Sequence, residues 1–107
     1  MDKIPIEIKN IIDRYLYQLK INNFPLKSVY LFGSYSKGNF NKYSDIDIAL
    51  VSDSFEGVRI NDREKIRKIT LSVSSYLEVI PFKTDDFNSE NPFAKEIMAT
   101  GIELPLN

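Results

Sequence analysis

Apolar residues recur at helical spacing in the first part of the chain. Over residues 5–21 they return every three or four positions, which places them on one side of a helix. These residues are Ile8, Ile11, Ile12, Tyr15, Leu16 and Leu19. The pattern predicts an amphipathic helix that packs its apolar side against a sheet and leaves its charged side in solvent.

Short apolar runs further along the chain predict strands. The runs cover residues 28–32, 45–51 and 76–81, with a final short piece at 102–104. After its two aspartates the second run is apolar at every position, which is typical of a strand covered on both faces. Proline lacks a backbone N–H, so Pro81 is expected to end the third strand.

Two further helices are predicted between and after the later strands. One begins at Asn61, because Asn61 and Glu64 have the spacing of a capping box. The other covers Pro92–Thr100, with Asn91 as its N-cap and Gly101 just past its end. The residues expected to pack inward are Ile66, Ile69, Thr70 and Val73 from the first and Phe93, Ile97 and Met98 from the second.

Alternating helices and strands in one short chain predict an α/β (α+β) fold. At 107 residues the chain can bury one real core, so residues 1–107 are expected to form a single domain. We expect a sheet of three to five strands with helices packed mainly on one face.

Two acidic residues stand at the start of the second strand. Side chains alternate faces along a strand, so Asp45 and Asp47 point to the same side. Two carboxylates on one face raise each other's pKa unless a positive charge lies between them. Carboxylate oxygens are hard ligands that suit Mg²⁺ or Mn²⁺, and Mg²⁺ is commonly shared between protein carboxylates and substrate phosphates.

A glycine-serine pair follows the first strand. Gly33 permits a sharp turn and Ser34 is a good N-cap, and residues 35–38 can form one helical turn closed by Gly38. A helix start with free N–H groups, a hydroxyl group and the nearby Lys37 is suited to holding phosphate. Phosphate at one strand end and metal at the next describe a nucleoside-triphosphate site.

These residues resemble a known signature. Gly33-Ser34, followed after ten residues by Asp45-Ile46-Asp47, is similar to the motif of the nucleotidyltransferase superfamily that includes DNA polymerase β. The short chain resembles the minimal nucleotidyltransferase branch, in which an antitoxin-like subunit often works beside an all-helical HEPN-type partner. The resemblance implies the nucleotidyltransferase fold, in which the sheet is mixed, with parallel and antiparallel strand pairs. It also implies an NTP substrate with ATP as the expected donor, and a HEPN-type partner or a homo-oligomer that completes the cleft.

The resemblance also implies roles for individual residues. Asp45 and Asp47 would hold Mg²⁺ on the triphosphate, and Glu78, on the strand after the second helix, would be the third carboxylate for a second ion. Gly33, Ser34 and Lys37 would grip the phosphates, and Ser44 would orient Asp45 or the phosphate. The chain would then transfer a nucleoside monophosphate to a hydroxyl acceptor, plausibly on a protein partner, and release pyrophosphate.

The chain departs from the family pattern at two places. Members often continue Gly-Ser-x-Ala-Arg-Gly, whereas this chain has Lys37 where the arginine stands, so the charge is kept without the bidentate fork. Many members have aspartate at the position of Glu78, which is longer by one methylene group. Glu78 also has a structural interpretation, as a glutamate of an edge strand that faces solvent.

Composition limits the chemistry further. The chain has no cysteine and no histidine, which excludes thiolate metal sites, cysteine nucleophiles and imidazole bases. Its formal net charge of −1 provides no field for attracting nucleic acid, so a nucleic-acid-binding domain is disfavoured. No apolar run approaches the roughly 20 residues that span a bilayer, and the first residues lack a signal-peptide core, so a cytoplasmic protein is expected.

Three alternatives stay open from the sequence. The basic residues of the second helix are either a solvated face or a docking surface for a partner protein; they are Arg59, Arg63, Lys65, Arg67 and Lys68. Asp85 and Asp86 are expected to be loop or cap residues and not metal ligands. The whole chain is either an enzyme or a catalytically weak, antitoxin-like subunit that acts by contact with a helical partner.

Overall fold

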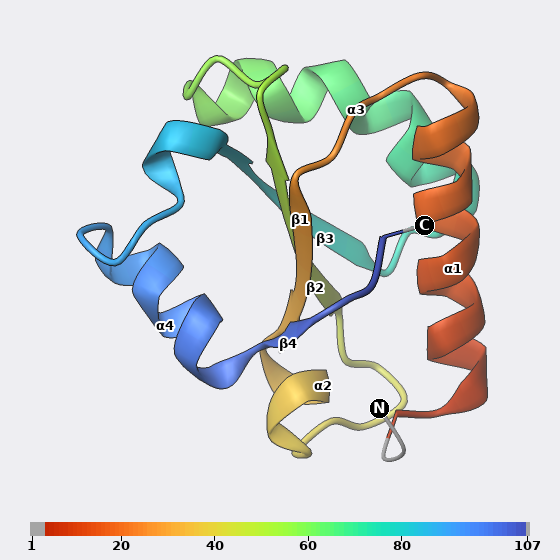
Figure 1. The fold of residues 1–107 in the computed structure, drawn as a ribbon. Coiled ribbons are helices and arrows are strands. Elements are labelled where there is room, and N and C mark those ends of the chain that lie inside the picture. Colours follow the sequence, from red (N-terminus) through yellow and green to blue (C-terminus); the bar gives the residue numbers. More distant parts are fainter. Residues whose placement is uncertain (1–3, 107) are drawn as a thin grey trace.

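The computed structural model describes residues 4–106 as one mixed sheet with helices on both sides (Figure 1). The predicted domain also included residues 1–3 and 107, which lie outside the described part. The elements in chain order are α1 (Ile6–Ile21), β1 (Ser28–Phe32), α2 (Ser34–Lys37), β2 (Ile46–Ser52), α3 (Arg59–Val73), β3 (Leu77–Lys83), the 3₁₀ turn η1 (Thr84–Asp86), α4 (Pro92–Thr100) and β4 (Ile102–Glu103).

The sheet has four strands in the order β3-β2-β1-β4. Strand β1 is antiparallel to both β2 and β4, whereas β2 and β3 are parallel. The registers place Phe32, Asp47 and Glu78 side by side in one row across β1, β2 and β3. The end of β1 and the starts of β2 and β3 therefore lie at the same edge of the sheet.

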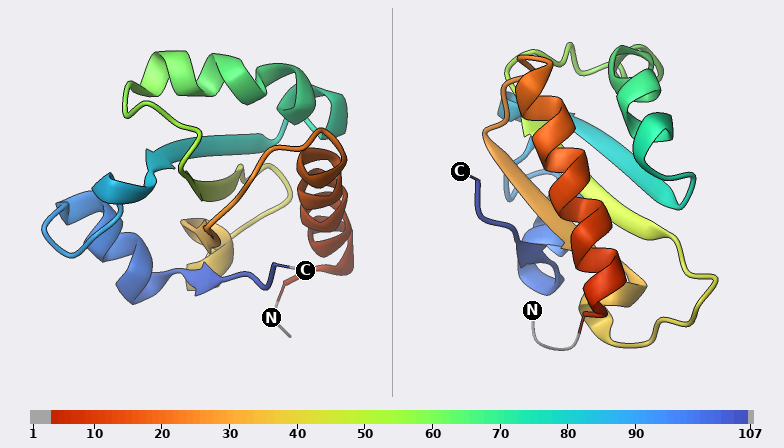
Figure 2. Two further views of the ribbon diagram at one scale, coloured as in Figure 1. Left: turned by 45° about the horizontal axis from the view of Figure 1, so that its top comes forward. Right: turned by 90° about the vertical axis from the view of Figure 1, so that its right-hand side faces the viewer.

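The helices form two layers of unequal size (Figure 2). The two long helices α1 and α3 pack on one face, where Ile12 and Ile66 join a core with Ile48 from β2. Helix α4 covers the opposite face, where Ala94 and Ile97 pack near Val51. The expectation of a mixed sheet with helices mainly on one face is thus confirmed. Within residues 4–106, none of the helices has the length and apolar character that crossing a membrane requires.

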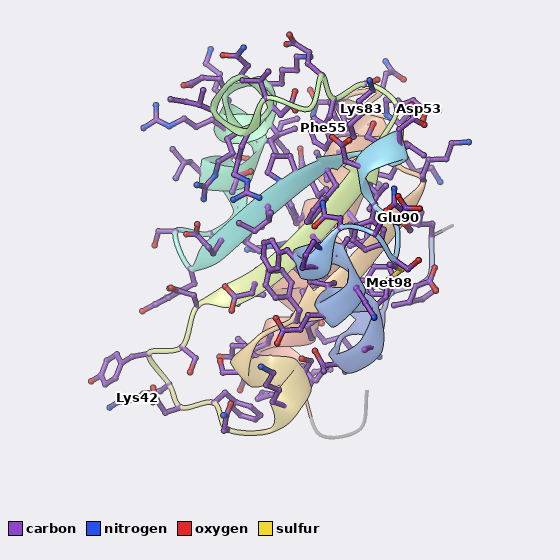
Figure 3. The ribbon with its side chains drawn as sticks, turned by 90° about the vertical axis from the view of Figure 1, so that its left-hand side faces the viewer. Lys42, Asp53, Phe55, Lys83, Glu90 and Met98 are labelled. Atoms are coloured by element: carbon purple, nitrogen blue, oxygen red, sulfur yellow. The ribbon has the colours of Figure 1, made fainter. Side chains whose placement is uncertain are left out.

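Pro81 and Met98 do not have the places that were predicted for them. Strand β3 continues through Pro81 to Lys83, because an edge strand pairs on one side only and tolerates a residue that has no N–H. Met98 does not pack inward: it lies on the outer side of α4 (Figure 3), 36% exposed, and Ala94 occupies the buried position beside Ile97. A small side chain there lets the helix approach the sheet closely.

Helix α3 begins two residues before the predicted start, so the predicted capping box of Asn61 and Glu64 is wrong. The buried carboxylate of Asp62, in the first turn, holds the preceding loop instead. Its two oxygens accept hydrogen bonds from the backbone N–H groups of Glu56 at 2.8 Å and Gly57 at 2.9 Å. Asp62 thus ties the loop after β2 to the helix that follows it.

We expect Asp62→Asn to lower the free energy of unfolding by about 1–3 kcal/mol, because the amide NH₂ group would face one of the two donating N–H groups and leave it unpaired. Urea denaturation of the purified protein measures the change. The matched control is Glu64→Gln on the exposed side of the same helix, which should shift stability by less than about 0.5 kcal/mol. Equal effects of the two changes would contradict this role of Asp62.

Candidate active site

The residues of the two sequence motifs meet at one edge of the sheet, beside α2 (Figure 1). Strand β1 ends there at Phe32, and β2 begins there with Asp47 directly opposite. Asp45 is exposed and stands one residue before β2. The antiparallel pairing of β1 and β2 thus brings the glycine-serine turn and the acidic pair together, although ten residues separate them in sequence.

Gly33 touches the carboxylate of Asp47. Its φ of +73° lies in the region that favours glycine. A Cβ atom added at Gly33 would stand only 3.0 Å from Cγ of Asp47, and its carboxylate oxygen would be nearer still. Only a residue without a side chain allows the turn and the carboxylate to approach this closely.

The predicted helical turn after Gly33 is present as α2, closed by Gly38 at a φ of +81°. The residue at its N-cap is Gly33, so the prediction of Ser34 as N-cap was wrong by one position. Tyr35 is buried and stacks on Phe40 at 4.6 Å between ring centroids, which fixes the turn to the core. Ser34 is half-buried and Lys37 is exposed, and both belong to α2 at this edge of the sheet.

Ser44 shapes the loop that leads into β2. Its Oγ accepts a hydrogen bond from the N–H of Asn41 at 2.9 Å, and its own N–H donates to the Asn41 carbonyl at 3.1 Å. Lys42 lies at the tip of this loop (Figure 3). The reciprocal pair closes a tight turn directly before Asp45, so Ser44 contributes to the site by holding the loop.

Asp47 lies in surroundings that disfavour the charged form of its carboxyl group. Burial raises the pKa of Asp47 above its ordinary value, and the negative charges of Asp45 and Glu78 raise it further. The charged form of Asp47 is therefore disfavoured by its burial and by two acidic side chains, one just before it in the chain and one across the strand pair. A divalent cation with oxygen ligands fits this need, so the residues present suit the metal that the sequence motif predicts.

Glu78 already has a partner of opposite charge. The guanidinium group of Arg63, on α3, forms a hydrogen-bonded ion pair with the Glu78 carboxylate. Among residues 4–106, no three acidic, histidine or cysteine side chains form a group ready to hold a metal ion. The structure thus brings the three acidic residues to one edge without closing them into a three-carboxylate site.

Sequence reasoning missed this role of Arg63. The sequence assigned Glu78 either to the metal site or to the solvent-facing side of an edge strand, and it grouped Arg63 with the basic residues of a solvated or docking face. Two others of those residues also form ion pairs. A guanidinium nitrogen of Arg67 lies 3.9 Å from a carboxylate oxygen of Glu64, and Nζ of Lys65 lies 3.2 Å from a carboxylate oxygen of Glu56. The sequence did show a carboxylate, Glu78, close to a helix with several basic residues. The spacing of those residues, however, does not say which of them reaches Glu78.

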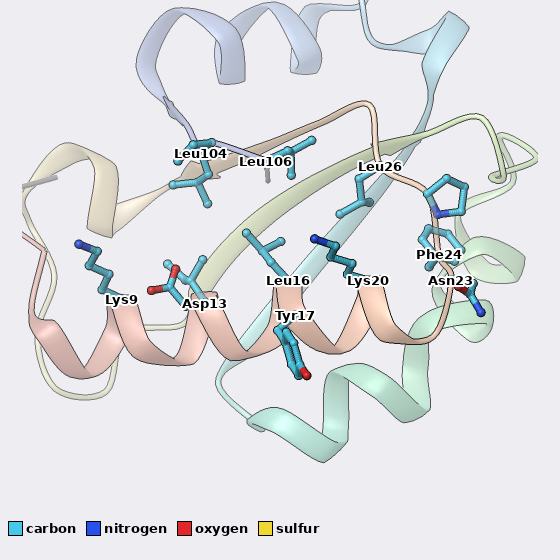
Figure 4. Close-up of a pocket in the computed structure, with 13 residues that line it drawn as sticks. Lys9, Asp13, Leu16, Tyr17, Lys20, Asn23, Phe24, Leu26, Leu104 and Leu106 are labelled. Atoms are coloured by element: carbon cyan, nitrogen blue, oxygen red, sulfur yellow. The ribbon is translucent and has the colours of Figure 1, made fainter.

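Two hollows in the surface of the described residues lie away from this edge. One pocket of about 750 Å³ runs between α1 and the C-terminal segment, with Leu16, Leu26, Leu104 and Leu106 around it (Figure 4). Another, of about 330 Å³, lies between α3 and β3. Neither is lined by the acidic pair or by the glycine-serine turn. The candidate site therefore lies outside both hollows, at a rim of the sheet where Asp45 and Lys37 are exposed.

The raised pKa of Asp47 predicts a pH-dependent stability. Above its folded-state pKa, wild-type protein bears the full cost of keeping the carboxylate ionised, and Asp47→Asn protein bears none. As pH falls through that pKa, the folded wild-type protein takes up a proton before the unfolded chain does. We expect the stability advantage of Asp47→Asn to be largest near neutral pH and to vanish below about 3.8, the ordinary value. Urea unfolding across this range tests it, and a pH-independent difference would contradict it.

Comparison with known proteins identifies relatives of this fold and motif. The family model described as "Nucleotidyltransferase domain" matches residues 12–99, which include both motifs and three of the four strands. The chain is 34% identical over 65 residues to a Methanocaldococcus jannaschii protein named "putative protein adenylyltransferase". That match covers 60% of this chain and 44% of the other, so the chain spans less than half the length of this relative.

Solved structures share the fold. The structure of a protein described as a "putative nucleotidyltransferase" from Sulfolobus solfataricus superposes with a TM-score of 0.66 at 17% identity, over 92% of this chain and 79% of that one. A structure described as a toxin-antitoxin with AMP-PNP superposes with a TM-score of 0.56 at 24% identity, over 89% and 73% of the two chains. At these identities the likeness establishes the fold alone.

Proposed function

Since this chain belongs to the nucleotidyltransferase domain family, we propose that it transfers AMP from ATP to a hydroxyl group on a partner protein. The observation that carries the proposal is the contact between Gly33 and Asp47, because it joins the turn that we expect to bind phosphate to an acidic pair at one edge of the sheet. The choice of AMP and of a protein acceptor is supported by the relative named as a protein adenylyltransferase.

The turn after β1 would bind the triphosphate. Gly33 allows phosphate oxygens to approach the backbone, and Ser34 offers a hydroxyl group at the start of α2. Lys37, exposed at the end of that helix, supplies a positive charge that can swing toward the β and γ phosphates. Unlike the planar guanidinium of arginine, a lysine ammonium is a point charge and makes no paired hydrogen bonds of fixed geometry. Phosphate binding by Lys37 would therefore depend on charge attraction.

Asp45 and Asp47 would hold the divalent cation, Mg²⁺ or Mn²⁺, and Ser44 would keep the loop before them in place. Glu78 would join them as the third carboxylate once its ion pair with Arg63 opens. When bound, the cation offsets the negative charge of the carboxylates and of the phosphates they face.

In the reaction, an acceptor hydroxyl oxygen forms a bond to the α phosphorus while the bond from that phosphorus to the bridging oxygen breaks. Pyrophosphate leaves, and the hydroxyl proton passes to a nearby base or to water. The chain orients the α phosphorus by holding the outer phosphates at Gly33, Ser34 and Lys37. No covalent protein intermediate is needed, which agrees with a chain that has no cysteine or histidine.

The partner would be a HEPN-type helical protein, or a second copy of this chain, that covers the open rim. Support comes from the fold shared with a toxin-antitoxin structure that was solved with AMP-PNP. Co-expression with the protein encoded beside this chain, followed by intact-mass spectrometry, tests the proposal. We expect the partner to gain one AMP only with ATP and Mg²⁺, and Lys37→Ala to lower the rate of labelling several-fold.

A second candidate function is binding without catalysis. The observation that favours it is the ion pair that occupies Glu78, because a site with only two available acidic groups holds metal less well. If the chain only binds its partner, the co-expression experiment should give a stable complex in which the partner carries no AMP. Asp47→Ala should then leave complex formation unchanged. AMP on the partner that disappears in Asp47→Ala would exclude it.

A further inference from the structure

The ion pair between Arg63 and Glu78 connects the helical layer to the candidate active site. Glu78 stands beside Asp47 in the row across the sheet, on the face covered by α4. Arg63 belongs to α3, which packs on the opposite face. The pair forms because β3 is the edge strand, so a long side chain from one layer can pass around the edge to the other.

The geometry of the pair decides which carboxylates are available. Asp47 and Glu78 are close enough for the charge of Glu78 to act on Asp47. The Glu78 carboxylate nevertheless turns to the guanidinium of Arg63, and these acidic side chains do not form a metal-ready group of three in the described part of the chain. The guanidinium of Arg63 thus binds the Glu78 carboxylate, which a divalent cation would need as its third ligand.

We propose that Arg63 is a positioning residue that holds Glu78 away from the cation site, so that the protein without nucleotide offers two carboxylates instead of three. This inference rests on the proposed function and adds that the ion pair limits when Glu78 can bind the cation. A divalent cation must break the ion pair before it gains its third ligand. Both members are about half exposed, at 44% and 46%, so the pair is weak enough to open.

The competition predicts that removal of Arg63 strengthens cation binding. Exposed ion pairs contribute modestly, so the gain should be about threefold to tenfold in Mn²⁺ affinity for Arg63→Gln. Electron paramagnetic resonance of free Mn²⁺, titrated into the full chain without nucleotide, measures it independently of any transfer activity. Arg67→Gln is the matched control: it removes the same charge one turn later on α3, where the partner is Glu64, and should change affinity less than twofold.

A double-mutant cycle separates the ion pair from general charge repulsion. In a chain that carries Glu78→Gln, Arg63→Gln should change Mn²⁺ affinity less than twofold, because no third carboxylate remains to be released. An equal gain with and without Glu78 would overturn the inference, since repulsion alone would explain it. No gain in Arg63→Gln would overturn it as well.

The outcomes also distinguish this inference from the proposed function. Mn²⁺ binding that Asp47→Asn abolishes, but that Arg63→Gln leaves unchanged, would overturn the role of Arg63 and keep the metal site. Absence of Mn²⁺ binding from wild-type protein and from every variant would overturn the metal site and this inference together.

Discussion

Asp47→Asn should reduce nucleotide transfer by on the order of 10²–10³-fold, the cost of removing one preorganised electrostatic group from an active site. Asp47 lies in the row between Phe32 and Glu78 and contacts the glycine turn, so its carboxylate stands where the acidic pair meets that turn. At neutral pH the variant should nevertheless melt at the same temperature as wild-type protein or higher, because burial and two acidic neighbours disfavour the ionised side chain.

Transfer rates from intact-mass spectrometry and melting temperatures from calorimetry test both parts. The matched control is Asp53→Asn, just past the other end of β2, which removes one exposed ion pair with Lys27. It should leave both activity and stability nearly unchanged. A variant at Asp47 that retains activity would remove this residue from the site, and one that melts far lower would assign it a structural role.

Gly33→Ala should damage both the fold and the activity. A side chain at a φ of +73° costs about 1–3 kcal/mol in backbone strain. The added Cβ would also push against the Asp47 carboxylate, so the turn and the acidic pair would have to move apart. A displacement of about 1 Å in an active site can cost roughly 10²-fold in rate, which is the loss of transfer we expect.

Gly38→Ala is the control for the strain alone. Gly38 has a similar φ of +81°, but a Cβ there would meet no atom within 4 Å. This variant should lose about 1–2 kcal/mol of stability and keep most of its activity. Unfolding in urea and transfer assays on both variants decide the matter. If the two alanine variants lose activity equally, the contact with Asp47 has no special role.

Much of the fold was predictable because local preferences agreed with the tertiary structure. The boundaries of α4 follow from Asn91, whose side chain accepts hydrogen bonds from two N–H groups of the first turn, and from Pro92 at the first position. The single turn of α2 follows from Gly38. The start of α3 was missed because Asp62 caps the preceding loop and not its own helix, which is a contact between segments.

The candidate site was predictable in part for the same reason. Residue type and spacing identified Gly33 and Asp47, since each is placed by its own strand. The contact between Gly33 and Asp47 could not be predicted from the sequence, because it depends on the antiparallel register of β1 and β2. The partner of Glu78 also escaped prediction, because Arg63 reaches it across two layers of the fold.

By itself the sequence determined which functional groups are available for catalysis. These are carboxylates, hydroxyl groups and lysine at two strand ends, with no cysteine or histidine. Periodicity and capping residues also determined most of the helices and strands, since these depend on neighbours a few positions apart. Only the tertiary structure decided that β3 is an edge strand and that Glu78 pairs with Arg63 before any metal arrives. The physical reason is that strand order and cross-layer contacts are set by packing among distant segments, on which local spacing has no influence.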